Sequence, residues 1–113
     1  MVDDHFYYGA IINVNFNPRS GHEQAGWRPA IIISNDTYNK INKNLRIVCP
    51  ITHTQQQNPF WIPVTECTKT DGYVIGNQPK ALDITSRRAK WVEDAPHLAD
   101  EVRDLVKTIF EFE

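Results

Sequence analysis

Short runs rich in β-branched and aromatic residues recur along this chain, and polar segments containing proline or glycine separate them. Such runs are typical of β-strands, because branched and aromatic side chains fit a pleated, half-buried surface. Two runs, at residues 28–34 (RPAIIIS) and 45–52 (LRIVCPIT), are strongly apolar and predict buried strands. Many strands of this length favour a small, strongly bent sheet or barrel.

We expect five further short strands, at residues 8–16, 60–64, 72–77, 78–84 and 89–93. Pro79 has no N–H to donate to a neighbouring strand, so the strand that contains it belongs at an edge or a bulge. The end of the chain is predicted to be a helix with Pro96 in its first turn, because apolar residues recur there at intervals of three and four. These residues are Leu98, Val102, Leu105, Ile109 and Phe112. The fold class is thus mainly β, with one C-terminal amphipathic helix packed on the sheet.

The length of 113 residues suits one compact domain, which we take to span residues 1–113. Twelve basic and fourteen acidic side chains nearly cancel, but their distribution is uneven. Residues 93–113 carry seven acidic and two basic side chains, which leaves ten basic and seven acidic before them. This balance argues against strong nonspecific binding to DNA and is compatible with a local groove that binds a polyanion.

Neither the cysteines nor the histidines stand at the spacing of a metal site. Cys49 and Cys67 form no C-x-x-C pattern, and the four histidines form no H-E-x-x-H pattern. We interpret both cysteines as reduced thiols, with Cys49 in the core. The N-terminus lacks the basic start and apolar run of a signal peptide, and no stretch approaches the roughly 18 apolar residues that cross a membrane. We therefore expect a cytoplasmic protein.

Arg28 stands where a polar, glycine-containing loop (GHEQAGW, residues 21–27) meets a buried strand. Pro29 pushes its predecessor toward an extended conformation, so Arg28 should be the last residue of the loop, supported by the rigid strand that follows. A guanidinium on so rigid a support is suited to phosphate, because its planar fork donates two parallel hydrogen bonds and keeps its charge. The alternative is that Arg28 closes the strand end through a carboxylate such as Glu23.

Thr52 ends the second buried strand, where its hydroxyl can bind a ligand or simply cap a turn. His53 follows it, and His22 lies in the glycine loop. Each is either an ordinary surface histidine or a group that transfers protons near neutral pH. Aromatic residues near the predicted loops offer stacking platforms for unpaired bases, although we expect most of them to be core or interface residues. These aromatic residues are Tyr7, Tyr8, Phe16, Trp27 and Trp61.

Four blocks of the sequence resemble the MazF/PemK/Kid-type toxins, in the same order and at matching spacing. The block GHEQAGWRPAIIIS (residues 21–34) resembles the G-x-E-Q-x-G-x-R-P motif and the aliphatic strand after it, and this match is specific. The blocks CPIT (49–52), NPFWIPV (58–64) and NQPKALD (77–83) are individually weaker matches. The resemblance covers nearly the whole chain.

This resemblance implies an SH3-like bent β-barrel with a C-terminal helix, working as a homodimer. It implies a metal-independent endoribonuclease, without a cofactor, that cleaves single-stranded RNA, often mRNA, at a short sequence. It also implies a cognate antitoxin that inhibits the toxin by threading an extended acidic segment through the RNA groove. The acidic C-terminal helix should then lie away from that groove, because its charge repels phosphate.

By the same resemblance, the family's catalytic arginine and threonine fall on Arg28 and Thr52, and the supporting loop glutamate falls on Glu23. We add His53 as an auxiliary acid or base, because it is adjacent to Thr52. Three regions are expected to bind RNA, namely the first loop, the segment after the second buried strand and the surroundings of the NQ pair. Their expected RNA-binding residues are Asn17, His22, Gln24, Trp27, His53, Gln55, Asn77, Gln78 and Lys80.

RNA is cleaved when its 2′-hydroxyl attacks the adjacent phosphorus and the additional negative charge is stabilised. Arg28 would bind the nonbridging oxygens as charge accumulates, and Thr52 would donate a hydrogen bond to the same phosphate. A guanidinium is a poor proton acceptor at neutral pH, so the groups that move protons stay unassigned.

Three positions depart from the family's pattern. Asn17 and Asn77 stand where the family commonly has aspartate, and Pro79 stands where it has an aliphatic residue. The loss of two carboxylates should ease the approach of phosphate, while the amides can still bind base edges. We expect an altered cleavage sequence with activity retained.

Two other functional classes compete with the ribonuclease. CcdB-like toxins share the barrel and inhibit gyrase, but they are expected to need a Trp-Gly-Ile-like tail, and this chain ends in KTIFEFE. A catalytically inactive SH3-like binding module is the other alternative, and the intact GHEQAGWRP and CPIT blocks argue against it. Incubation with RNA separates these classes.

Overall fold

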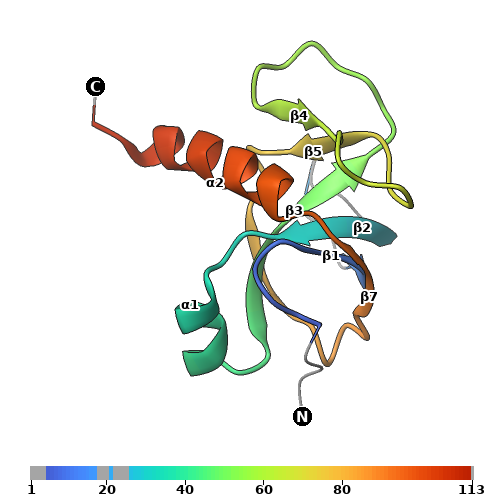
Figure 1. The fold of residues 1–113 in the computed structure, drawn as a ribbon, viewed down its shortest axis with the longest axis vertical. Helices are drawn as coiled ribbons and strands as arrows, with labels where there is room; N and C mark the ends of the chain where they lie inside the picture. The colour runs from blue at the N-terminus through green and yellow to red at the C-terminus, as the bar shows by residue number, and fades with distance from the viewer. Residues whose placement is uncertain (1–4, 18–20, 22–25, 113) are drawn as a thin grey trace.

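The computed structural model describes residues 5–17, 21 and 26–112 of the chain. The strands in this part are β1 (Ala10–Asn15), β2 (Trp27–Ile32), β3 (Leu45–Thr52), β4 (Trp61–Pro63), β5 (Tyr73–Ile75), β6 (Lys80–Asp83) and β7 (Lys90–Asp94). The helices are α1 (Asp36–Ile41) and α2 (Pro96–Phe110) (Figure 1). The predicted strands and the C-terminal helix are confirmed, and β1, β4, β5 and β6 are shorter than expected.

The strands form one strongly bent antiparallel sheet in the order β4-β5-β3-β2-β1-β7, with β6 also paired to β3. β3 is the longest strand and pairs with β2 along one side. Along its other side, Leu45 to Val48 pair with β6, whereas Ile51 and Thr52 pair with β5. Among the described strands β6 pairs only with β3, and Pro79 directly precedes it, which agrees with the edge position expected from the missing N–H.

The two faces of the sheet bury two separate cores. One face packs against α2 in a core that includes Ile11, Ile31, Ile33, Cys49, Ile51, Val74, Leu98, Ala99 and Val102. The bend of the sheet encloses the other face in a core that includes Ala10, Ile12, Val14, Phe16, Ala30, Ile32, Val48, Leu82 and Ile84. Because successive residues of a strand point to opposite faces, β1, β2 and β3 contribute to both cores, which explains their nearly continuous apolar sequence.

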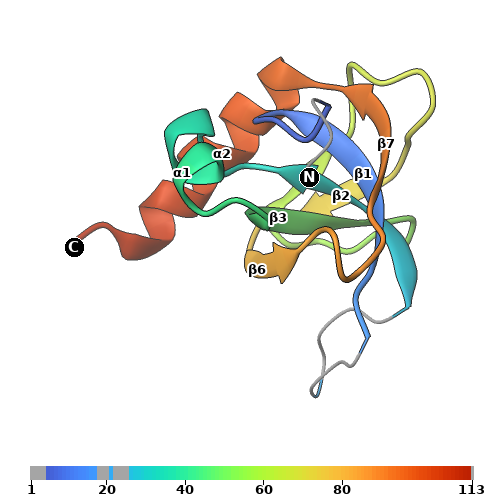
Figure 2. The ribbon, with the colours of Figure 1, turned by 90° about the horizontal axis from the view of Figure 1, so that it is seen from below.

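Helix α2 lies along the first of these faces, and its C-terminal end projects beyond the sheet (Figures 1 and 2). Leu98 and Val102 are buried, but the apolar stripe does not stay buried to its end. Ile109 is 43% exposed, and Phe112, which follows the last helical turn, is fully exposed, because the sheet ends before they do. No helix in the described ranges combines the length and the apolar character that crossing a bilayer requires.

The N-terminus of α2 is capped from a distant loop. The residue at the N-cap position, Ala95, has no side-chain acceptor for the free N–H groups of the first turn. Glu66, in the connection between β4 and β5, accepts hydrogen bonds from the N–H groups of His97 and Leu98 at 3.0 and 3.2 Å. A carboxylate at this end of a helix also interacts favourably with the helix dipole.

Glu93 of β7 holds the same connection in place. Its carboxylate accepts hydrogen bonds from the N–H groups of Thr68 and Lys69 and from the hydroxyl of Thr70, at 2.8 to 3.0 Å. Desolvation by burial acts to raise the pKa of Glu93, but these hydrogen bonds together with the charge of Lys69 bring it below its ordinary value. Two carboxylates, Glu66 and Glu93, thus fix a long loop that has no regular structure of its own.

Both cysteines are free thiols, as expected. Cys49 is fully buried, and burial raises the pKa of its thiol to about 12. Cys67 is half-buried, and its pKa is raised to about 11 by burial and by the nearby carboxylates Glu93 and Glu66. Neither thiol is therefore in the reactive thiolate form at neutral pH.

Arg46 ties the N-terminal segment to the turn after α1. The residue is only 4% exposed, and its guanidinium donates to four backbone carbonyl oxygens. Nε donates to Phe6 at 2.8 Å, and Nη1 lies within 2.6 to 3.2 Å of the carbonyl oxygens of Asn39, Lys43 and Leu45. Burial lowers the pKa of Arg46 from its usual value. The charge is stabilised by peptide dipoles, two of them near the C-terminal end of α1.

We expect Arg46→Met to lower the free energy of unfolding by about 3 kcal/mol, because several carbonyl oxygens lose their donor while the volume is nearly kept. Urea denaturation followed by tryptophan fluorescence measures this loss. The matched control is Lys40→Met, which replaces an exposed basic residue on α1. It should change the free energy of unfolding by less than about 0.5 kcal/mol. Equal effects of the two substitutions would contradict the structural role of the buried guanidinium.

Candidate functional site

Arg28 and Thr52 lie at the same end of two neighbouring strands and on the same face of the sheet. β2 and β3 are antiparallel, and Ala30 lies opposite Pro50. Arg28 lies two residues before Ala30 on β2, and Thr52 lies two residues after Pro50 on β3. Because the two strands run in opposite directions, both steps lead to the same end of the pair. Because side chains alternate with a period of two, all four residues share one face. The register of β2 on β3 thus brings together the two residues predicted to be catalytic.

Val14 and Tyr73 continue this row across the sheet. Val14 pairs with Arg28, and Tyr73 pairs with Thr52. Directly opposite residues of antiparallel strands have neighbouring side chains on one face. Tyr73 is half-buried and was not among the residues predicted from the sequence. Its signal was weak, because a tyrosine in a short strand usually serves packing.

Thr52 is nearly buried in the described structure, with 5% of its surface exposed. Its Oγ1 accepts a hydrogen bond from the N–H of Thr54 at 3.2 Å, so the residue does cap a turn. A hydroxyl that accepts one bond can still donate its own proton, and capping therefore leaves its use as a donor open. Gly72, with φ of +108°, lets the chain pass close to this point, since a Cβ there would lie 2.3 Å from the carbonyl oxygen of Thr52.

The neck of the loop between β1 and β2 is closed by Asn17. Its Oδ1 accepts a hydrogen bond from the N–H of Gly26 at 2.9 Å, and the N–H of Phe16 donates to the Gly26 carbonyl oxygen at 2.8 Å. An aspartate would accept the same bond, so Asn17 keeps this geometry without a negative charge. Trp27 follows at the start of β2 and is 52% exposed, whereas Phe16 is buried. Arg87, which the sequence did not single out, also donates hydrogen bonds to this neck.

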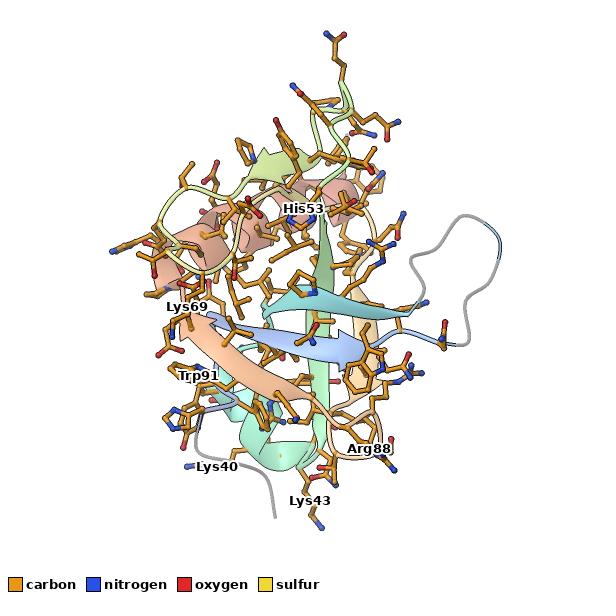
Figure 3. The ribbon with its side chains drawn as sticks, turned by 90° about the vertical axis from the view of Figure 1, so that its right-hand side faces the viewer. Lys40, Lys43, His53, Lys69, Arg88 and Trp91 are labelled. Atoms are coloured by element: carbon orange, nitrogen blue, oxygen red, sulfur yellow. The ribbon has the colours of Figure 1, made fainter. Side chains whose placement is uncertain are left out.

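His53 lies on a different side of the strands from this row. Its Nε2 is 2.6 Å from Oδ1 of Asp71, and both side chains are largely exposed. It lines a pocket of about 260 Å³ together with Asn13, Pro29 and Lys69 among others (Figure 3). Asn13 and Pro29 pair with each other, one residue away from Val14 and Arg28, so they belong to the opposite face of the sheet.

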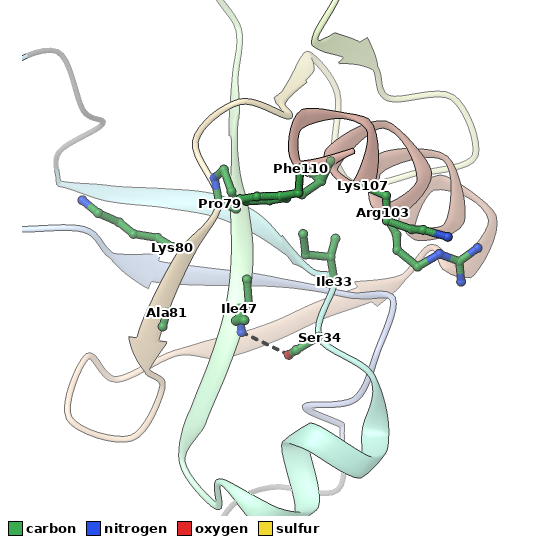
Figure 4. A pocket seen from close by; sticks show the side chains of 10 residues that line it. Ile33, Ser34, Ile47, Pro79, Lys80, Ala81, Arg103, Lys107 and Phe110 are labelled. Carbon is green, nitrogen blue, oxygen red and sulfur yellow. Dashed lines mark hydrogen bonds between the residues drawn. The ribbon is translucent and has the colours of Figure 1, made fainter. Parts of the chain in front are cut away.

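The other residues expected to bind RNA lie in loops and on β6. Gln55 is exposed in the segment after β3, and Asn77 and Gln78 form the turn between β5 and β6, where Asn77 is exposed. Lys80 pairs with Val48, which shares its face of β3 with Thr52. Figure 4 shows the Lys80 side chain running away from α2. His22, Glu23 and Gln24 lie outside the described residues.

The expected position of the acidic helix agrees with this geometry. α2 packs on the face that carries Ile31 and Ile51, opposite to the face of Arg28 and Thr52. Within the ranges that the structure describes, no three His, Cys, Asp or Glu side chains gather where they could hold a metal ion. By their shared strand end and face, Arg28 and Thr52 make a candidate anion site of one guanidinium and one hydroxyl.

Comparison with known proteins gives concordant matches in sequence and structure. The family described as "PemK-like, MazF-like toxin of type II toxin-antitoxin system" matches residues 7–110. The endoribonuclease toxin ChpB of Escherichia coli (strain K12) is 38% identical over 103 residues, which cover 86% of this chain and 84% of that protein. The endoribonuclease toxin MazF of the same strain is 34% identical over 100 residues, with 88% of this chain and 85% of that protein covered.

Solved structures support the same relationship. MazF from Deinococcus radiodurans superposes with a TM-score of 0.85 at 32% identity, over 96% of this chain and 98% of that chain. A MazE–MazF structure from the same organism superposes with a TM-score of 0.78 at 27% identity, over 98% of this chain and all of that chain. The bent sheet with its C-terminal helix is therefore the MazF fold, and the chain belongs to the PemK-like, MazF-like toxin family of type II toxin–antitoxin systems.

Proposed function

We propose that this chain is a toxin endoribonuclease that cleaves single-stranded RNA, mRNA above all, at a short sequence and without a metal ion or cofactor. The observation that carries the proposal is the placement of Arg28 and Thr52 on one face, at one end of β2 and β3, in a chain of this family. Cleavage of mRNA would stop translation. Because mRNA is its substrate, the proposal places the protein in the cytoplasm.

In the proposed reaction, the ribose 2′-oxygen attacks the adjacent phosphorus and the 5′-oxygen leaves. The products are a cyclic or 3′ phosphate and a 5′-hydroxyl. Charge on the nonbridging oxygens increases as the 2′-oxygen approaches, and Arg28 stabilises it through two parallel hydrogen bonds. Thr52 adds a hydrogen bond from its hydroxyl, whose oxygen is already oriented by the N–H of Thr54. Glu23 supports the site from the loop.

Both residues act only if they are preorganised. Pro29 restricts the backbone of Arg28, and pairing with Val14 fixes its place in the sheet. Thr52 lies at the end of β3, where it pairs with Tyr73 of β5. Donors fixed in this way need no reorganisation when charge develops, and this makes electrostatic stabilisation effective.

Single-stranded RNA would cross the end of β2 and β3 at which Arg28 and Thr52 lie, because the rest of this face is enclosed in a core. Trp27 and Tyr73 offer rings on which unpaired bases can stack. Asn17, Gln24, Gln55, Asn77 and Gln78 offer amides for base edges, and His22 and Lys80 offer contacts to phosphate. Because Asn17 and Asn77 are uncharged where relatives of this type commonly carry aspartate, we propose a cleavage sequence that differs from theirs.

We propose that His53 contributes to RNA binding. Its imidazole is held by Asp71 and lines the pocket with Asn13 and Pro29, on the face opposite to Arg28. RNA that crosses the ends of the strands can reach this side, where His53 would contact a nucleotide next to the cleaved one. A group there is badly placed to take the proton of the attacking hydroxyl.

An antitoxin partner fits the same face. Neighbouring structures include MazE–MazF complexes. We propose that a cognate antitoxin places an extended acidic segment along the RNA path, where its carboxylates meet Arg28 and Lys80. Such a segment competes with RNA phosphate for the same positive charge.

We propose further that the chain is a homodimer formed by the projecting end of α2. Ile109, Phe110 and Phe112 are exposed there. Phe110 lines a groove of about 380 Å³ whose apolar floor includes Ile33, Ile47, Pro79 and Val106 (Figure 4). Arg103 and Lys107 line the same groove, so the acidic tail residue Glu111 of a second copy would meet basic side chains. A second copy placing its own apolar tail here buries both patches by two-fold symmetry.

Arg28→Ala and Thr52→Ala should each slow cleavage of a long unstructured RNA about a hundredfold to a thousandfold, because each removes a preorganised donor. The assay contains EDTA, and cut sites and end groups are mapped. Arg88→Ala and Thr85→Ala, which alter exposed residues of the β6–β7 turn, serve as matched controls that retain activity. Well-folded protein without any cleavage would overturn the ribonuclease and point to a binding module or a gyrase inhibitor.

His53→Gln should raise KM for RNA severalfold while the shape of the pH–rate profile between about pH 5 and 8 stays that of the wild type. A proton carrier with a histidine's ordinary titration range would instead shape that profile, and its removal would flatten one limb. If His53→Gln flattened one limb of the pH–rate profile, His53 would be assigned as an acid or base in the reaction.

Phe110→Glu should convert the protein to monomers in sedimentation velocity, because it places a charge in the centre of the proposed interface. Ile41→Glu is the matched control, since Ile41 is 70% exposed on α1 and does not line the groove. A dimer that survives Phe110→Glu would mean that another surface holds the two copies together.

A further inference from the structure

Arg87 connects two parts of the chain that are distant in sequence. It lies in the turn between β6 and β7, half-buried, and its Nη1 donates to the carbonyl oxygen of Asn15 at 2.9 Å and to that of Asn17 at 2.8 Å. A terminal guanidinium nitrogen carries two hydrogens, so these two bonds use both of them. This nitrogen is fully engaged by backbone and has no hydrogen left for a substrate.

The carbonyl groups that Arg87 binds belong to the neck of the loop between β1 and β2. At this neck the N–H of Asn17 donates to Oδ1 of Asn15, and Oδ1 of Asn17 accepts from the N–H of Gly26, both at 2.9 Å. The N–H of Phe16 donates to the carbonyl oxygen of Gly26 at 2.8 Å. Arg87 therefore holds the side of the neck formed by Asn15 and Asn17. The bonds from Gly26 to Asn17 and from Phe16 to Gly26 hold the other side of the neck against it.

The neck determines where Arg28 lies. Asn15 pairs with Trp27, and Val14 pairs with Arg28, so the end of β1 that Arg87 binds is the part of the sheet on which Arg28 rests. On its other side, β2 pairs with β3 at Ala30, two residues further on. A shift of the β1 end is therefore transmitted to Arg28 through strand pairing.

We infer that Arg87 is a positioning residue for cleavage: by holding the carbonyl oxygens of Asn15 and Asn17, it fixes the strand end that presents Arg28 to the scissile phosphate. The inference deepens the proposed function and rests on it. Through these two bonds Arg87 acts on the backbone of the strand end, and the role inferred for it is positioning. Its cation also adds to the positive potential of this end of the molecule, but that is a secondary effect.

The expected size of the effect follows from how sharply catalysis depends on geometry. A displacement of a catalytic group by about 1 Å can lower a rate about a hundredfold. Removing Arg87 leaves the strand pairing in place, and the Asn17 carbonyl oxygen is exposed, so water can replace the lost donor there. The protein should therefore fold normally and lose part of its rate.

The test compares Arg87→Gln with Arg88→Gln, which removes the same charge one residue further along the turn, from an exposed side chain. Arg87→Gln should lower kcat about tenfold to a hundredfold and leave KM and its salt dependence near those of the wild type. Arg88→Gln should change none of these. Arg87→Lys should recover much of kcat, because an ammonium group can donate to both carbonyl oxygens from one nitrogen.

Hydrogen–deuterium exchange provides a readout that does not need activity. In Arg87→Gln the amides of residues 14–17 and 26–28 should exchange faster, whereas in Arg88→Gln they should not. Unchanged exchange at the neck, or unchanged kcat in an active enzyme, would overturn the inference. A raised KM with a salt slope reduced by about one would also overturn it, since that pattern identifies a phosphate contact.

These outcomes separate the inference from the proposed function. Wild-type protein that cleaves no RNA refutes the ribonuclease, and the inference about cleavage fails with it, even where exchange at the neck still depends on Arg87. Wild-type protein that cleaves RNA, combined with full activity of Arg87→Gln, refutes the positioning role alone.

Discussion

The antiparallel pairing of β2 with β3 is the contact on which the candidate site depends. Ala30 opposite Pro50 sets the register, and the alternation of side chains then places Arg28 and Thr52 on one face and the apolar residues under α2 on the other. A slip of β2 by one residue along β3 would turn Arg28 to the face under α2, away from Thr52. The burial of two cores, one on each face, makes such a slip costly and so keeps the two polar groups in place.

Around this sheet, several charged side chains bind backbone groups of distant segments. Arg46 and Arg87 donate to carbonyl oxygens, while Glu66 and Glu93 accept from N–H groups. Each satisfies peptide groups in a turn, a helix end or a loop neck, where regular pairing stops. The two cores are mainly aliphatic, whereas these irregular segments, including the loop neck next to Arg28, are held by charge-assisted bonds.

Much of the fold could be read from local patterns. The β-branched runs located the strands, and the prediction that Pro79 belongs to an edge agrees with its place before β6. The spacing of apolar residues predicted α2 but could not tell that the sheet ends before Ile109 and Phe112, because spacing defines a helix face and not what covers it. Tyr73 and Arg87 escaped prediction because their partners are distant in sequence.

The sequence by itself determined the strands, the C-terminal helix, the family resemblance and the choice of Arg28 and Thr52, since each rests on residue type and short-range spacing. Only the tertiary structure decided which of these residues share a face. His53 is adjacent to Thr52 in the chain, yet it pairs with Asp71 and lines a pocket on the opposite side of β2 from Arg28. Arg87 is 72 residues from Asn15 and binds it directly. Strand register and turn geometry set such contacts, and both arise from the packing of the whole chain.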